Sequence, residues 1–169
     1  MEFKIYSKKH GEFNIKIDPE DWKRVKKHNW SISQNRKEER FYVQTHVKKF
    51  GKLVKTKLHR FILNAKNGEI VDHINNDPLD NRKENLRICT IAQNSRNRKK
   101  RCNSNCKYKG VNYHKRLKKY QANITLDYKR KHLGTFETEL EAAIAYNEAA
   151  LKYHGEYALL NDVEPYKLN

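Results

Sequence analysis

Four polar residues at fixed spacing carry the clearest chemical signal in this sequence: Asp72 and His73 are adjacent, Asn85 follows, and Asn94 closes the series. Hydrolysis of a phosphodiester needs a deprotonated water, a cation on the scissile phosphate and help for the leaving 3′-oxygen. Histidine titrates near neutrality and can accept a proton from water. Carboxylate and amide oxygens suit a hard divalent cation, which needs only one or two protein ligands because it keeps several waters. The set therefore indicates metal-assisted phosphodiester hydrolysis.

Short elements must hold these residues in place. Residues 70–74 have a strand pattern, and residues 75–85 are dense in Asn and Asp, which favour turns. Residues 86–89 predict a second short strand. The Thr-x-x-Gln pattern of residues 90–93 has the spacing of a capping box and predicts a helix running towards Arg98.

These elements predict how the four side chains are used. Neighbours on a strand point to opposite faces, so one of Asp72 and His73 could hold a metal while the other reaches a water. Asn94 falls in the first turn of the predicted helix, where its amide oxygen can face back towards Asp72. Asn85 closes the loop and could either bond the loop backbone or fix the ring of His73.

The N-terminal third is strand-like. Alternating apolar and polar residues around His10 and Gly11 predict a hairpin, and Gly51 marks the turn of a second strand pair. We expect strands near 3–6, 13–17, 41–45 and 53–56, and short helices near 18–21 and 58–63. The lysines of the second pair either lie on a duplex backbone or form a charged, solvated sheet face, and the sequence leaves both open for Lys48, Lys49, Lys52, Lys55 and Lys57.

The C-terminal part shows three strand patterns followed by one helix pattern. The strands are expected near 108–111, 120–124 and 132–136. A capping box at residues 138–141 opens a helix that ends before Gly155. We expect one side of that helix to hold Leu140, Ala143, Ile144, Asn147 and Leu151. Three strands and one amphipathic helix make a small complete unit.

Net charge points to the class of partner. The 169 residues include 37 Lys and Arg against 20 Asp and Glu, which gives a net charge of +17. A field of that sign attracts polyanions, so nucleic acid is the first partner to consider. Charge alone would also fit a ribosomal or merely soluble basic protein. No apolar run approaches bilayer length and residues 1–11 do not resemble a signal segment, so we expect neither membrane association nor secretion.

The cysteines give a weaker signal. Cys89, Cys102 and Cys106 are odd in number, which fits reduced thiols in a reducing compartment. Cys102 and Cys106 have C-x3-C spacing and His114 follows, but a complete ligand set is missing. A structural zinc is therefore not expected.

The central motif resembles a known nuclease family. The runs Asp72-His73-Ile74-Asn75, Asp80-Asn81-Arg82, Glu84-Asn85-Leu86-Arg87 and Gln93-Asn94 look like the His-Asn-His (HNH) motif of phage and mobile-intron homing endonucleases. That resemblance implies a ββα-metal (His-Me finger) core with His73 as general base. It also implies Asp72 and Asn94 as ligands of one divalent ion, and Asn85 as the residue that orders the loop and orients His73. An amide as last ligand favours Mg²⁺ or Mn²⁺ over Zn²⁺.

The C-terminal part resembles the ethylene-response-factor type of DNA-binding domain found in plants. Residues 108–111, 133–136, 141–150 and Asn161 carry this resemblance. It implies that a three-stranded sheet enters the major groove while the helix packs behind it. Specific base reading and simple phosphate clamping both stay open. The DNA-contact residues expected from it, together with two arginines beside the nuclease helix, are Arg96, Arg98, Asn112, His114, Arg116, Lys118, Lys119, Gln121, Asn123, Arg130 and His132.

Together these patterns predict an α+β protein in three parts: an N-terminal β region (1–57), a ββα-metal nuclease core (58–101) and a C-terminal three-stranded antiparallel sheet packed on one helix (102–169). The expected activity is metal-dependent hydrolysis of double-stranded DNA, and no obligate protein partner is indicated. The resemblance implies the cytoplasm or nucleoid of a bacterial or phage-infected cell. Two alternatives remain: a catalytically inactive, sequence-specific DNA-binding regulator, and an RNA-binding protein. His59 matches the nuclease pattern too, and we expect it to be packed or phosphate-bonding rather than a second base.

Overall fold

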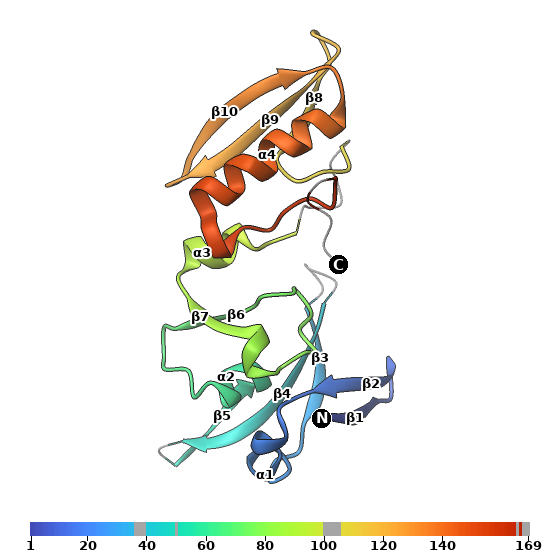
Figure 1. Cartoon of the computed structure of the whole chain (residues 1–169). Coiled ribbons are helices and arrows are strands. Elements are labelled where there is room, and N and C mark those ends of the chain that lie inside the picture. The colour runs from blue at the N-terminus through green and yellow to red at the C-terminus, as the bar shows by residue number, and fades with distance from the viewer. Residues whose placement is uncertain (36–39, 50, 100–105, 165, 167–169) are drawn as a thin grey trace. The chain divides into compact units, whose positions relative to one another are not determined.

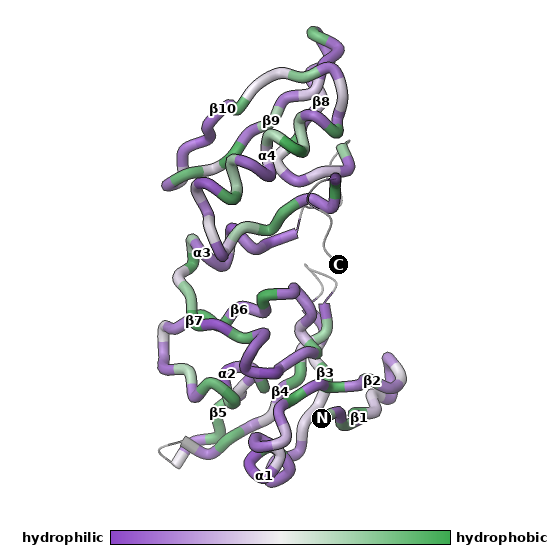
Figure 2. The backbone as a smooth tube through the Cα atoms, viewed as in Figure 1, coloured by the Kyte–Doolittle hydropathy of each residue, from purple (hydrophilic) through white to green (hydrophobic). Residues whose placement is uncertain are grey.

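The chain forms two compact units of mixed α and β structure, Met1–Thr90 and Ile91–Asn169 (Figure 1). The computed structural model describes residues 1–35, 40–49, 51–99, 106–164 and 166. Each unit combines short helices with small antiparallel sheets, of which the described residues form three in the first unit and one in the second. Hydrophobic and hydrophilic stretches alternate along both units (Figure 2), in keeping with separate small cores. None of the helices in the described ranges is long and apolar enough to cross a membrane.

The first unit contains three small antiparallel sheets. A two-stranded sheet pairs β1 with β2, a three-stranded sheet has the order β3-β4-β5, and a second pair joins β6 to β7. The elements are β1 (Glu2–Ser7), β2 (Gly11–Lys16), η1 (Pro19–Asp21), α1 (Trp22–Val25), β3 (Ser31–Asn35), β4 (Arg40–Lys49), β5 (Lys52–Lys57), α2 (Leu58–Ile62), β6 (Ile70–His73), η2 (Lys83–Asn85) and β7 (Leu86–Cys89). The strands expected from alternation are confirmed, and β3 is an addition that the polar sequence of this segment did not indicate.

One apolar cluster joins all parts of the first unit. It includes Ile15 of β2, Val43 of β4, Leu58 and Ile62 of α2, and Leu86 of β7. Each sheet is too small to bury its apolar face alone, so the N-terminal strands and residues 58–90 close a single core. The structure therefore shows no boundary at residues 57/58, and the two units divide after Thr90 rather than near residue 101.

The N-terminal hairpin is bonded to the loop that follows β6. The backbone N–H of Lys16 donates to the carbonyl of Leu79 at 2.9 Å, and the N–H of Asn81 donates to the carbonyl of Lys16 at 2.8 Å. These bonds form a short parallel bridge between Lys16 and Asp80. The edge of β2 thus fixes the backbone of a loop that has little regular structure of its own.

The second unit consists of α3 and a three-stranded antiparallel sheet, in the order β10-β9-β8, with α4 across one face (Figure 1). Its elements are α3 (Ile91–Arg96), β8 (Val111–His114), β9 (Lys119–Leu126), β10 (Lys129–Phe136), α4 (Glu139–His154) and η3 (Gly155–Tyr157). The predicted sheet and helix are confirmed. The first strand was placed wrongly: residues 108–110 precede β8, because Gly110 turns the backbone with φ of 78°.

Helix α4 begins as expected, and its packed side matches the expected one in part, at Ala143 and Asn147. The Thr138 hydroxyl accepts a hydrogen bond from the N–H of Glu141, and the Glu141 carboxylate accepts one from the N–H of Thr138. Leu140 and Leu151, which were expected on the packed side, are 47% and 46% exposed. The buried positions are Ala142, Ala143, Tyr146, Asn147, Ala149, Ala150 and His154. Small alanines let the helix approach the sheet closely, and Tyr146 fills the remaining space.

Gly110 is required by that close approach. A Cβ atom at this position would lie 1.9 Å from the ring of Tyr146. Glycine adopts this positive φ without strain and has no Cβ atom to meet the ring. The Tyr-Lys-Gly-Val run therefore has a packing explanation.

Candidate active site

The hairpin of β6 and β7 holds the adjacent pair Asp72 and His73. In its register Asp72 faces Arg87 and His73 faces Leu86. Both residues of the pair are buried, each with 7% relative exposure. Their side chains meet different neighbours, as expected for consecutive strand positions.

Asn85 organises the loop between the two strands. Its Oδ1 accepts from the backbone N–H of Asn75 at 2.9 Å, and its Nδ2 donates to the carbonyl of Asp80 at 2.7 Å. Its own carbonyl accepts from the N–H of Ile74 at 2.9 Å. Of the two roles open for Asn85, the structure therefore shows the bonding of the loop backbone.

The residue that bonds the His73 ring is Asn81, which the sequence left without a role. Its Oδ1 lies 3.4 Å from Nε2 of His73, a long hydrogen bond. Its Nδ2 donates to the carbonyl of Pro78 at 3.2 Å, which orients the amide with its oxygen towards the histidine. An amide oxygen only accepts, so Nε2 of a neutral His73 carries the hydrogen and Nδ1 carries the lone pair.

A second histidine packs against the first. The ring of His59, from α2, stands edge-on to the ring of His73, with centroids 4.8 Å apart and planes at 86°. Tyr42 of β4 lies on another side of His59, with ring centroids 6.0 Å apart. His59 is 6% exposed, so it is packed, one of the two roles expected for it.

Burial keeps both rings neutral. It lowers the pKa of His73, although the bond to Asn81 and the nearby carboxylates act in the opposite direction. Burial also lowers the pKa of His59 to well below its ordinary value, and the positive charges of Lys57, Arg60 and a protonated His73 would each lower it further. A general base must be unprotonated to act, so the low pKa suits His73 to that role at neutral pH.

Asp72 is held by an arginine. Nε and Nη2 of Arg87 lie 3.0 Å and 2.8 Å from Oδ2 of Asp72. The two side chains are only 8% and 12% exposed, so this pair is largely shielded from water. Asn94, the other predicted ligand, lies on α3 in the second unit.

The two predicted ligands, the carboxylate of Asp72 and the amide of Asn94, offer oxygen atoms, which suit a hard divalent cation. In the described ranges no three His, Cys, Asp or Glu side chains gather as a metal-binding group. For the zinc alternative, Cys106 is buried in the apolar cluster beneath α4, and Cys102 lies outside the described residues.

Most of the predicted DNA-contact residues share one face of the second sheet. Val111, Ala122 and Ile124 pack towards α4. The register and the alternation of strand side chains place the opposite set on the outer face. That set comprises Asn112, His114, Lys119, Gln121, Asn123, Arg130 and His132.

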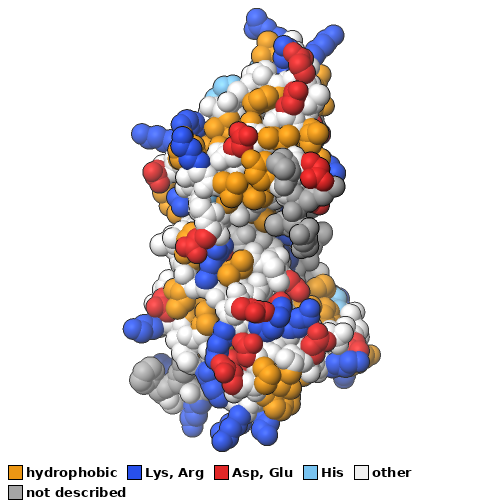
Figure 3. Space-filling model, viewed as in Figure 1, with side chains coloured by type: hydrophobic (Ala, Val, Ile, Leu, Met, Phe, Trp, Pro, Cys, Tyr) orange, Lys and Arg blue, Asp and Glu red, His pale blue; other side chains and the backbone are white. Residues whose placement is uncertain are grey.

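The remaining predicted contacts lie off the strands of that sheet. Arg116 and Lys118 occupy the turn between β8 and β9, Arg96 ends α3, and Arg98 follows it. Lys119 pairs with Glu137 at 2.5 Å, which partly neutralises its charge. Lys and Arg side chains appear over both units on the face displayed in Figure 3.

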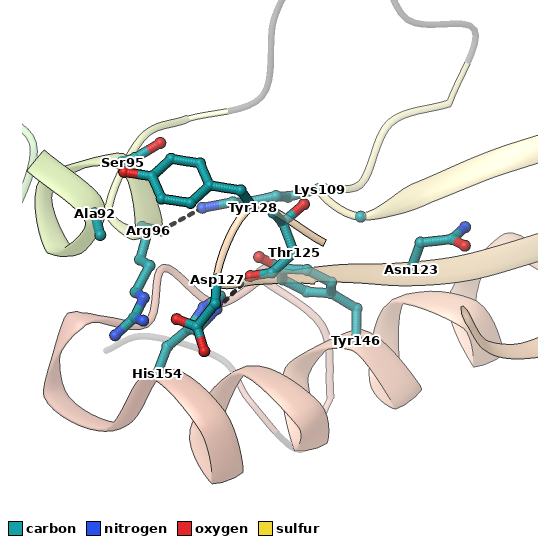
Figure 4. Close-up of a pocket in the computed structure, with 11 residues that line it drawn as sticks. Ala92, Ser95, Arg96, Lys109, Asn123, Thr125, Asp127, Tyr128, Tyr146 and His154 are labelled. Carbon is teal, nitrogen blue, oxygen red and sulfur yellow. Dashed lines mark hydrogen bonds between the residues drawn. The ribbon is translucent and has the colours of Figure 1, made fainter. Parts of the chain in front are cut away.

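The second unit also contains a pocket of about 320 Å³, shown in Figure 4. Arg96 and Asn123 line it together with Lys109, Tyr146 and His154. Burial lowers the pKa of Lys109 to about 8, and its ammonium donates to the carbonyl of Arg96. Nδ1 of His154 and Nδ2 of Asn123 are buried and have no hydrogen-bond partner in the described part of the chain. None of the four nuclease-motif residues lines this pocket.

Comparison with known proteins identifies the central segment. Residues 56–96 match the family model of the HNH endonuclease, and this stretch includes all four motif residues as well as His59, Asn81 and Arg87. An uncharacterised HNH endonuclease of Acanthamoeba polyphaga mimivirus is 33% identical over 120 residues. That alignment covers 66% of this chain, and the chain spans 60% of the length of its relative. No solved structure matches significantly. These similarities support a nuclease that acts on DNA.

Proposed function

We propose that the chain is a metal-dependent DNA endonuclease in which Nδ1 of His73 takes a proton from the attacking water. The observation that carries this proposal is the bond between Nε2 of His73 and Oδ1 of Asn81. It leaves the lone pair of a buried, neutral ring on the other nitrogen, where a base needs it. Asn85 supports the reaction by holding the loop from which Asn81 reaches His73.

Asp72 and Asn94 would hold one divalent ion, Mg²⁺ or Mn²⁺. When bound, the ion polarises the scissile phosphate and stabilises the leaving 3′-oxygen. Arg87 orients the carboxylate of Asp72 through Oδ2 and offsets the negative charge buried there. The expected products carry 5′-phosphate and 3′-hydroxyl ends.

The second unit would bind double-stranded DNA through the outer face of its sheet, in the manner of the ethylene-response-factor type domain. What supports this is the shared face, with α4 on the other side and Arg130, Gln121 and Asn112 among its side chains. Arg and amide side chains on a sheet can reach base edges in the major groove. A binding unit beside a nuclease unit suits site-specific cleavage of the homing type.

The direct test is cleavage of a library of genomic duplex fragments by the full chain, with Mg²⁺ or with EDTA. The proposal predicts cleavage at a small number of sites with Mg²⁺ alone, and 5′-phosphate ends in the sequenced products. Absence of cleavage from fragments that the protein binds specifically would overturn it.

That second outcome would favour a DNA-binding regulator without catalytic activity. The observation in favour of this alternative is the Asp72–Arg87 ion pair, which already engages one oxygen of the proposed metal ligand. The two functions differ in one measurable respect: a regulator binds the same site and leaves its strands intact. Preferential binding of duplex RNA would instead support the RNA-binding alternative, since the narrow A-form major groove excludes a sheet.

A further inference from the structure

The sheet formed by β3, β4 and β5 in the first unit has one buried face and one open face. On β4, Val43, Thr45 and Val47 are buried, and the alternate positions point the other way. The antiparallel register brings the corresponding residues of β3 and β5 onto the same side. We call this side the open face; it comprises Ser31, Ser33, Asn35, Tyr42, Gln44, His46, Lys48, Leu53, Lys55 and Lys57.

The open face is basic and carries no acidic side chain among these ten residues. Lys48 and Lys55 are exposed and form no salt bridge with the residues that the structure describes. Lys4 of the same unit, by contrast, pairs with Glu12 at 2.8 Å. Leu53 lies between the lysines in the register and is 73% exposed. An unneutralised basic strip of this kind attracts a polyanion.

A chain of ring contacts leads from this face to the candidate base. Nζ of Lys57 lies 3.9 Å from the centroid of the Tyr42 ring, on the open face. Tyr42 contacts His59 with centroids 6.0 Å apart, and His59 contacts His73 at 4.8 Å. Packed rings therefore connect the basic strip with the buried candidate base, His73, inside the first unit.

We propose that the open face is a docking surface for the backbone of duplex DNA and guides the duplex to His73. The inference rests on the proposed function, from which DNA is taken as the ligand. Six residue steps along β4, from Tyr42 to Lys48, span roughly 20 Å, the length of about six base pairs. Lys48, Lys55 and Lys57 would contact phosphates, which fixes register without reading bases. The interpretation of these lysines as a merely solvated face is thereby replaced by a binding role.

The first test neutralises two lysines in the full chain. The double variant Lys48→Gln and Lys55→Gln is compared with Lys26→Gln and Lys27→Gln, two exposed lysines that follow α1 in the same unit. Duplex affinity is measured from about 50 to 200 mM salt. Loss of two phosphate contacts makes the slope of log affinity against log salt concentration shallower by about 1.8. The ratio of wild-type to variant affinity should therefore fall roughly tenfold between the lowest and the highest salt concentration. The control pair should keep the slope of the wild type.

The second test places a photo-crosslinking residue on the surface itself. p-Benzoylphenylalanine replaces Leu53 on the open face or, as the control, Tyr6 of β1, which is 75% exposed. Crosslinking of duplex DNA at position 53 and not at position 6 supports the docking surface. Equal crosslinking at both positions, or equal slope changes in both lysine pairs, overturns it.

The two tests separate this inference from the proposed reaction. If the variant with p-benzoylphenylalanine at position 53 crosslinks duplex DNA and the wild type binds but does not cleave it, the docking surface stands and the proposed hydrolysis fails. If the wild type cleaves DNA with Mg²⁺ and position 53 does not crosslink, the hydrolysis stands and the docking surface fails.

Discussion

The ring of His59 stands perpendicular to that of His73, with centroids 4.8 Å apart. His73 is thus held on one side by this ring and on another by the amide of Asn81, at 3.4 Å. His59 comes from α2, and Asn81 comes from the loop between β6 and β7, which is bonded to β2. Positioning of the candidate base therefore depends on most of the first unit.

Removal of the supporting ring should slow cleavage without weakening DNA binding. A general base displaced by about 1 Å loses on the order of 10²-fold in rate. We expect His59→Ala to lower kcat by about 10- to 100-fold, with duplex affinity close to that of the wild type. His59→Phe keeps an aromatic ring against His73 and should retain most of the activity. The measurement is single-turnover cleavage with the folded fraction determined by circular dichroism; equal rates for the two variants would contradict the positioning role.

His59 should also make the first unit sensitive to acid. Its pKa is well below the ordinary value in the folded protein because of burial, whereas the unfolded chain binds a proton near pH 6.5. The neutral ring therefore contributes fully to the free energy of unfolding above pH 6.5, and this contribution is lost as the pH falls below that value. Between pH 7 and 5, the free energy of unfolding should fall by roughly 1–2 kcal/mol more in the wild type than in His59→Phe. Urea unfolding measures this, with His46→Gln, at an exposed site, as the control.

Asn81 should matter for rate more than for affinity. Asn81→Leu removes the acceptor at Nε2 of His73 and frees the ring to change tautomer. We expect cleavage to fall by about 10²-fold while duplex binding is unchanged. Asn67→Leu, at an exposed position of the same unit, serves as the control and should cleave like the wild type. A rate for Asn81→Leu that matches this control would show that the bond has no part in catalysis.

Gly110 should be far less tolerant of a side chain than Gly51. The two glycines have nearly the same φ, 78° and 77°, but only at Gly110 would a Cβ meet another group, the ring of Tyr146. Gly51→Ala should lower the free energy of unfolding by about 1–2 kcal/mol, from the strained φ alone. Gly110→Ala adds overpacking and should lower it by about 2–5 kcal/mol. Equilibrium unfolding followed by circular dichroism checks this, and equal losses would contradict the packing of α4 described above.

The sequence predicts much of the fold because local patterns decide much of it. Alternation around His10 and Gly11 predicts the first hairpin, and the Thr138 capping box predicts the start of α4. β3 was missed because Ser31–Asn35 has almost no apolar alternation, and pairing with β4 makes it a strand. The packed side of α4 was predicted in part: Ala143 and Asn147 are buried as expected, whereas Leu140 and Leu151 are exposed, because close helix–sheet packing selects small residues.

Local sequence patterns also predict a part of the candidate site. The motif spacing places Asp72 and His73 on β6 and Asn85 in η2, directly before β7. Asn81 carries no local mark that separates it from the other Asn and Asp residues of its loop. Its role depends on the bond between its backbone and Lys16, a contact between distant parts of the chain. The metal-binding role of Asp72 and Asn94 stays a prediction.

The most direct test of the account is single-turnover cleavage of a bound duplex by the wild type and by His73→Ala, each with Mg²⁺ and with EDTA. Asn67→Ala, at an exposed position of the same unit and away from the open face, is the control. The account predicts that His73→Ala binds the duplex normally and cleaves about 10²- to 10⁴-fold more slowly, the usual contribution of a general base. It also predicts that Asn67→Ala cleaves within a few-fold of the wild-type rate. Cleavage by His73→Ala at the wild-type rate would contradict the central claim.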